Sequence, residues 1–159
     1  MFTGDRSGDW LFASLHRTGF ANQPTSVSLD DGLRLRGAWV TAAVRCAPPA
    51  NRPLPQERDN CLPWTQAELG LLPRARVVVC LGAFAWDAAL RLLTARGEAV
   101  PRPRPKFGHG AERAIGAYTL LGTFHPSQQN TFTGKLTEPM MDAVFQRARE
   151  LAGLLPYPR

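Results

Sequence analysis

Three short apolar runs, separated by stretches of helical periodicity, constrain the fold of this chain most strongly. They cover residues 37–45, 75–82 and 116–124. Continuous apolar runs of this length are typical of strands that are covered on both faces of a sheet. Helices are predicted near residues 8–20, 64–72, 83–97 and 138–154. The alternation predicts an α/β fold with three layers, in which helices cover both faces of a central, mostly parallel sheet.

The length of the chain predicts one domain. Its 159 residues, of which 44% are hydrophobic, can bury one ordinary core. No apolar run approaches the roughly 20 residues of a membrane span, and residues 1–15 lack the basic start and apolar core of a signal peptide. We therefore expect a single domain over residues 1–159, located in the cytoplasm, monomeric and without membrane association.

The chain carries a net charge of +6, and Arg supplies most of the positive charge. Among the 19 basic residues, only Lys106 and Lys135 are lysines. The flat guanidinium fork matches phosphate bidentately, so an Arg-rich excess favours an anionic partner such as nucleic acid. Codon bias in a GC-rich genome explains the same composition without reference to function, and composition alone does not separate these two explanations.

A histidine stands where the last apolar run gives way to a polar loop. His125 follows residues 116–124, and ligands of open parallel sheets bind outside the carboxyl ends of the strands. Pro126 biases His125 toward extended geometry and prevents the strand from continuing. Residues 127–135 offer hydroxyls, amides and one Lys but no acid, which suits a phosphate backbone. On this signal alone, His125 is either catalytic or a structural histidine.

The three cysteines are an odd number in a chain without an export signal, which argues against a disulfide framework. Cys46 and Cys61 bracket a Pro-rich loop. They are either ligands of a metal or iron–sulfur cluster or two unrelated thiols, and two ligands make only half of such a site. Cys80 lies inside an apolar run and is predicted to be a core residue.

A polar turn over residues 3–10 leads into the first predicted helix. In a purely structural interpretation, Ser7 or Asp9 caps this helix and Asp5 is a solvated turn residue. No strand precedes the turn, although a βαβ layout would place one beside the first helix. A second Pro-rich segment, residues 100–110, is basic and is predicted to be a surface connector.

Four segments together resemble the uracil-DNA glycosylase superfamily. They include the turn Thr3-Gly4-Asp5 and the strand end His125-Pro126-Ser127, and they occur in the order of the family at residues 2–11, 40–49, 81–82 and 122–127. The resemblance covers residues 2–155 and is closest to family 5, the B-type enzymes with a 4Fe-4S cluster. It implies a monofunctional glycosylase of base excision repair, which hydrolyses the N-glycosidic bond of uracil or other deaminated bases in double- or single-stranded DNA.

The resemblance also implies roles for individual residues. His125 would stabilise the negative charge of the departing base, and Asp5 would position or activate the attacking water. Cys46 and Cys61 would be two of the four cluster ligands.

Further residues match the family's DNA-contacting segments. Asn51 matches an Asn near the base pocket. Ser127 and the loop after it match the segment that meets the DNA backbone and fills the space left by the flipped base. This segment points to three further residues, Gln129, Asn130 and Lys135.

The sequence also departs from the family. Family members carry, before the turn that contains Asp5, a strand with a Gly-Leu-Ala-Pro type motif and a Cys pair that completes the cluster. Neither is present, so we expect an N-terminally truncated chain, from a mis-started reading frame or a degraded paralogue. The alternative function is a catalytically impaired DNA-binding remnant. A small nucleotide-binding protein is a third hypothesis, which the absence of a Gly-rich phosphate loop weakens.

Overall fold

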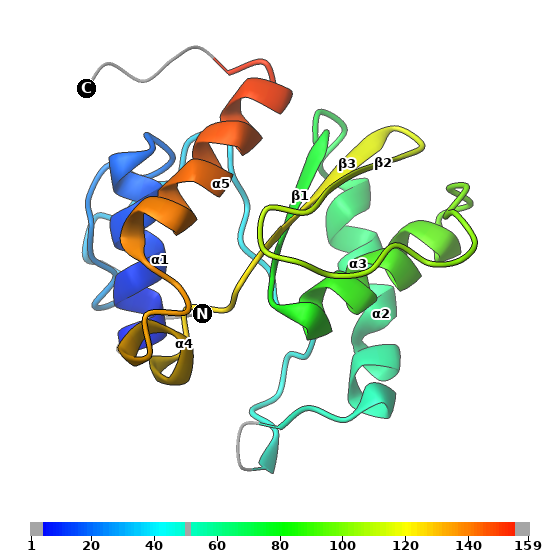
Figure 1. Ribbon diagram of the computed structural model, residues 1–159, viewed down its shortest axis with the longest axis horizontal. Helices are drawn as coiled ribbons and strands as arrows, with labels where there is room; N and C mark the ends of the chain where they lie inside the picture. Colours follow the sequence, from blue (N-terminus) through cyan, green and yellow to red (C-terminus); the bar gives the residue numbers. More distant parts are fainter. Residues whose placement is uncertain (1–4, 50–51, 155–159) are drawn as a thin grey trace.

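The structure of the protein, a computed structural model, describes residues 5–49 and 52–154 (Figure 1). The described elements follow one another as α1 (Arg6–Arg17), α2 (Pro55–Gly70), β1 (Val77–Leu81), α3 (Ala83–Ala95), β2 (Glu112–Ile115), β3 (Tyr118–Thr123), α4 (Gln128–Phe132) and α5 (Glu138–Leu151). None of the described helices is both long and apolar enough to cross a membrane.

Strand β3 lies at the centre of a sheet with the order β1-β3-β2. It pairs with β1 in parallel, so that Leu81 lies opposite Thr123 where both strands end. It pairs with β2 in antiparallel fashion, as a hairpin whose turn contains Gly116 at a φ of 56°. The α/β class is confirmed, but the described sheet is mixed, because only one of its two pairings is parallel.

Helices cover both faces of the sheet (Figure 1). Helices α1 and α5 lie on one side, and α2 and α3 lie on the other. The first layer packs through one core cluster, to which α1 contributes Leu11 and Leu15 and α5 contributes Met141 and Val144. Trp86, Leu90 and Leu93 of α3 pack in a second cluster. The three predicted layers are therefore present.

Hydrogen bonds attach α1 to α5. The buried Ser14 donates its hydroxyl proton to Asp142 Oδ1 at 2.6 Å. Arg17 donates from Nε to Asp142 Oδ2 at 2.7 Å and lies 3.3 Å from Glu138. One carboxylate, that of Asp142, accepts from two α1 side chains. The contact therefore holds α1 against α5 and also sets its position along the axis of α5.

The prediction of a strand over residues 37–45 is wrong. This segment forms no ladder in the described structure, and the nearest regular pairing is an isolated antiparallel bridge between Ala21 and Leu35. Ala38 and Val40 pack against the same core cluster as Val77 and Val79 of β1. The apolar side chains of residues 37–45 are therefore explained by the packing of an irregular segment against the core, and not by strand pairing.

Helix α2 begins earlier than predicted, at Pro55 rather than near residue 64, and so takes in part of the expected Pro-rich loop. A proline at the first helical position is favourable because its missing N–H would have no intrahelical partner there. Glu57 accepts the N–H of Leu54 at 2.7 Å and secures this end. As a result, Cys61 lies on a helix.

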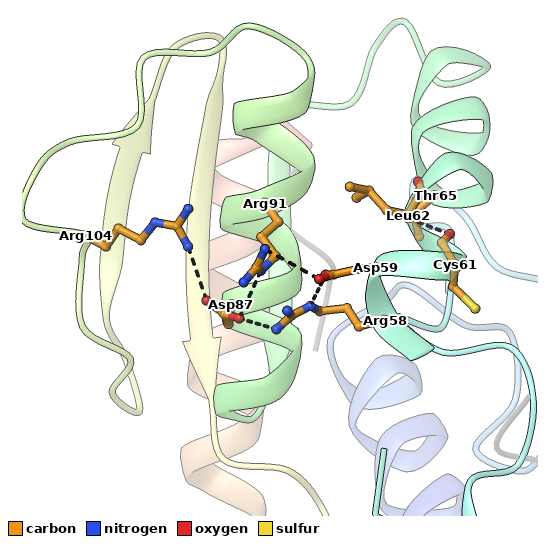
Figure 2. Close-up of polar contacts among 8 residues, drawn as sticks. All are labelled: Arg58, Asp59, Cys61, Leu62, Thr65, Asp87, Arg91 and Arg104. Carbon is orange, nitrogen blue, oxygen red and sulfur yellow. Dashed lines mark hydrogen bonds and ion pairs between the residues drawn. The ribbon is translucent and has the colours of Figure 1, made fainter. Parts of the chain in front are cut away.

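A buried arginine joins α2 to α3 (Figure 2). Arg58 is 5% exposed, donates from Nε to Asp59 at 2.9 Å and donates from Nη1 to Asp87 of α3. Arg91 and Arg104 each approach Asp87 at 3.6 Å. Two carboxylates thus compensate three guanidinium groups, and this cluster, the α2–α3 clamp, fixes the helix that carries Cys61.

Candidate active site

The carboxyl ends of β1 and β3 support His125. The N–H of Gly82, just after β1, donates to the carbonyl oxygen of Thr123 at 2.8 Å. Gly82 has a φ of 92°, and a Cβ on it would lie 3.3 Å from the Cβ of His125. A glycine is therefore required at this position both for its backbone conformation and for the close approach of His125.

Residues after His125 hold its backbone in place. Pro126 is fully buried, and Asn130 donates from Nδ2 to the carbonyl oxygen of His125 at 2.9 Å. Asn130 belongs to α4, a short helix that begins after Ser127 and that replaces part of the predicted loop. The imidazole of His125 itself is half-buried.

Asp5 caps the amino end of α1. Its Oδ1 accepts the N–H of Gly8 at 2.6 Å, while the residue remains exposed. The prediction that Ser7 or Asp9 caps this helix is therefore wrong. The cap fixes the carboxylate where the chain enters α1.

The structure brings Asp5 and His125 within electrostatic reach of each other. Burial lowers the pKa of His125 from its ordinary value of 6.5, and the negative charge of Asp5 acts in the opposite direction. With the lowered pKa, the ring is neutral at neutral pH, and a neutral imidazole still carries one N–H that it can donate. A hydrogen-bond donor just beyond the end of β3 and a carboxylate at the start of α1 thus lie within electrostatic range of each other.

The predicted DNA-contacting residues differ in their exposure to solvent. Ser127 is half-buried, and its carbonyl oxygen accepts the N–H of Asn130 at 2.9 Å. Gln129 and Lys135 are exposed, and the Lys135 ammonium lies 4.8 Å from the ring centroid of Phe124. Asn51 lies outside the described residues.

Two contacts near the site were not predicted from the sequence. The guanidinium of Arg6, at the start of α1, lies 4.8 Å from the ring centroid of Phe132 on α4. Phe132 is 64% exposed. The sequence did single out Phe132, because it is the only apolar side chain in residues 127–135. His109 also approaches the site and stacks on Phe124 with 5.1 Å between ring centroids.

The cysteines do not form a cluster site in the described structure. Cys46 is exposed, Cys61 is half-buried, and the described residues contain no group of three or more His, Cys, Asp or Glu side chains that could hold a metal. Two thiols alone do not fit a cluster that takes four protein ligands. Cys80 is 2% exposed, and burial raises the pKa of its thiol to about 12, which confirms it as a core residue.

Comparison with known proteins assigns the chain to a family. The family profile of the uracil DNA glycosylase superfamily matches residues 1–149. The chain therefore belongs to the uracil DNA glycosylase superfamily. It is similar to the type-5 uracil-DNA glycosylase of Mycobacterium tuberculosis (strain CDC 1551 / Oshkosh), with 54% identity over 156 residues, 97% of this chain and 57% of the relative.

Other relatives extend this similarity. The type-5 uracil-DNA glycosylase of Thermus thermophilus is 48% identical over 154 residues, 96% of this chain and 68% of the relative. A type-4 uracil-DNA glycosylase of Pyrobaculum aerophilum is 28% identical over 117 residues, 73% of this chain and 56% of the relative. The predicted resemblance to family 5 is confirmed. The chain spans a little over half the length of the mycobacterial relative.

Proposed function

We propose that this protein is a monofunctional DNA glycosylase of base excision repair, which hydrolyses the N-glycosidic bond of uracil or another deaminated base. The observation that carries the proposal is the charge of Asp5 acting on the half-buried His125 at the end of β3. Membership of the superfamily supports it.

His125 serves the departing base. As the bond between the base nitrogen and the sugar C1′ breaks, its electron pair leaves with the base, whose carbonyl oxygen gains negative charge. The neutral His125 ring donates an N–H to this oxygen. A pre-positioned donor of this kind contributes ~3 kcal/mol of transition-state stabilisation.

Asp5 serves the sugar. The transition state has oxocarbenium character, as in other glycosyl transfers, and a nearby carboxylate stabilises its positive charge. Oδ1 of Asp5 is engaged by the helix cap, and the second oxygen can orient a water molecule toward C1′. The water oxygen bonds to C1′, its proton passes through the carboxylate or solvent, and the base anion is protonated in turn. No covalent enzyme intermediate is needed.

The partner in this proposal is damaged DNA, double- or single-stranded, from which the target base flips out at a cost of a few kcal/mol. Exposed cations such as Arg52, Lys106 and Lys135 would contact phosphates, whereas Arg45 is already paired with Glu68 at 2.7 Å. The proposal includes one domain over residues 1–159, acting as a cytoplasmic monomer. A 4Fe-4S cluster, which the resembling family carries, would find only two of its four ligands here, Cys46 and Cys61, so the proposal assigns it no part in the reaction.

The test uses the full chain and an end-labelled duplex with a single uracil. Uracil release leaves an abasic site, which alkali converts to a strand break. We expect breaks with the parental chain, a tens- to thousands-fold lower rate with His125→Ala, and the parental rate with His16→Ala on α1 as the matched control.

Binding to an abasic-site analogue distinguishes the alternatives. His125→Ala should bind it with nearly parental affinity, because the residue acts on the leaving base rather than on the phosphates. Binding without release by the parental chain would support the catalytically impaired DNA-binding protein instead. If the parental chain neither binds the analogue nor releases uracil, both the glycosylase and the DNA-binding alternative are overturned.

A further inference from the structure

A side chain, rather than a neighbouring strand, binds the first backbone N–H beyond the end of β3. The N–H of Phe124 donates to Nδ1 of His109 at 3.3 Å. The same nitrogen lies 3.4 Å from the hydroxyl oxygen of the buried Thr123. His109 therefore extends the hydrogen bonding of β3 by one residue, up to the residue that precedes His125.

The segment that carries His109 is pressed against β3. Gly110 donates its N–H to the carbonyl oxygen of Gly122 at 2.7 Å, and Gly122 donates to that of Ala111 at 2.8 Å. A Cβ on Gly122 would collide with the carbonyl oxygen of Gly108. Glycine at position 122 thus permits an approach that a side chain would prevent, and this approach places His109 at the strand end.

Ring contacts hold Phe124 from several directions. The His109 ring stacks on it with an interplanar angle of 29°. Phe107 meets it edge-on at 6.2 Å between ring centroids, and Lys135 lies near its face at 4.8 Å. A stack together with a backbone hydrogen bond leaves Phe124, and hence the start of His125, little conformational freedom.

The contacts of His109 require one protonation state. Nδ1 can accept the Phe124 N–H only when it carries no proton, so the neutral ring holds its proton on Nε2. Burial lowers the pKa of His109 from its ordinary value of 6.5, and a backbone hydrogen bond with Met140 acts in the opposite direction. Since Met140 belongs to α5, one imidazole connects the strand end to the helix layer.

We infer that His109 is a positioning residue for His125: its Nδ1 and its ring fix the backbone of Phe124, and so set where the His125 imidazole lies relative to Asp5. The inference rests on the proposed function for its catalytic consequence. It gives a role to residues 100–110, the Pro-rich basic segment that the sequence predicts to be only a surface connector.

The structural test does not require activity. His109→Asn keeps an acceptor close to the position of Nδ1, whereas His109→Gln, the matched control, carries the same amide one carbon further out. In ¹⁵N-labelled protein, we expect the Phe124 amide to exchange at nearly the parental rate in His109→Asn and about tenfold faster in His109→Gln. The His125 titration should move only in His109→Gln. Unchanged exchange and titration in His109→Gln, or a protonated Nδ1 in the parental chain, would overturn the inference.

The kinetic test uses single-turnover uracil release at saturating DNA. We expect His109→Gln to slow release about tenfold while affinity for an abasic-site analogue stays nearly parental, and we expect His109→Asn to recover most of the rate. Equal rates for His109→Gln and the parental chain would overturn the inference. If the parental chain releases no uracil, the proposed function fails, and the amide-exchange result still decides the position of His109.

Discussion

Asp5 combines two roles that substitution can separate. Its Oδ1 caps α1, and its charge acts on His125. Asp5→Asn keeps an acceptor for the Gly8 N–H but removes the charge, whereas Asp5→Ala removes both.

We therefore expect Asp5→Asn to lower the rate of uracil release tens- to thousands-fold, about 2–4 kcal/mol, with little change in stability. Asp5→Ala should lose a similar rate and, in addition, ~1 kcal/mol in the free energy of unfolding. Single-turnover kinetics and urea unfolding measure the two effects. A parental rate for Asp5→Asn would refute the catalytic role, whatever its stability.

The two histidines with lowered pKa values predict how stability depends on pH. In the unfolded chain they protonate near the ordinary value of 6.5, and in the folded chain only at lower pH. Below 6.5 the unfolded chain therefore holds more protons, so the free energy of unfolding decreases as pH falls and is fully retained above that value.

Urea unfolding between about pH 7.5 and about pH 5.5 measures this slope, in a range where ordinary carboxylates stay ionised. The double variant His109→Asn, His125→Gln should flatten it. If the free energy of unfolding depends on pH as steeply in the double variant as in the parental chain, other groups cause the dependence.

At this scale the sequence predicted that His125 follows a strand end, but not that Asp5 caps α1 or that His109 binds the residue before it. An apolar run that ends before a His-Pro pair locates a strand end without tertiary information. The proximity of Asp5 came only from the resemblance, because about 120 residues separate the two. His109 could not be predicted, because its position depends on the close packing of its segment against Gly122.

At the scale of elements, the same apolar signal predicted two strands correctly and one wrongly. Residues 75–82 and 116–124 contain β1 and β3, which pair with each other. Residues 37–45 are equally apolar but have no ladder partner in the described structure, and a run of apolar side chains carries no information about which backbone lies beside it. β2 was missed because four residues with two charged side chains give no period-two pattern.

The α2–α3 clamp yields a prediction at this scale. Arg58→Met removes a buried charge, whereas Asp87→Asn leaves it less compensated, so the second change should be the more destabilising. We expect a loss of about 2–3 kcal/mol for Asp87→Asn, reduced from the fully buried case because Asp87 is 42% exposed, and less for Arg58→Met. Urea unfolding of the two single variants and of the double variant gives a double-mutant cycle, which measures the interaction between Arg58 and Asp87. Equal, additive losses would show that the two side chains do not interact.

At the scale of the whole molecule, the net charge of +6 predicts strongly salt-dependent DNA binding. Each phosphate contact releases counterions, so the logarithm of the affinity should fall linearly with the logarithm of the salt concentration. Fluorescence anisotropy at increasing salt measures the slope. Lys135→Ala should make it shallower by about one unit, and Arg45→Ala, whose charge is already paired with Glu68, should change it less. An affinity that does not change with salt concentration would contradict the proposed phosphate contacts.

The cysteine inventory gives a second whole-molecule prediction. With Cys46 and Cys61 as the accessible thiols and Cys80 in the core, the purified 159-residue chain should carry little iron and absorb weakly in the iron–sulfur region. Iron analysis and the visible spectrum test this. One cluster per chain would mean that further ligands, from this chain or a second copy, complete the site.

His125 and Asp5 depend on different structural supports, so the proposed chemistry can be lost without unfolding of the whole protein. His125 is fixed to the end of the sheet, whereas Asp5 travels with α1, which Ser14 and Arg17 fasten to α5 through Asp142. Fraying of the first turn of α1 moves the carboxylate away while the sheet stays folded, and helix ends open at a small fraction of the global free energy. Mild heating should therefore inactivate the protein reversibly, at temperatures where its spectroscopic signature is still native.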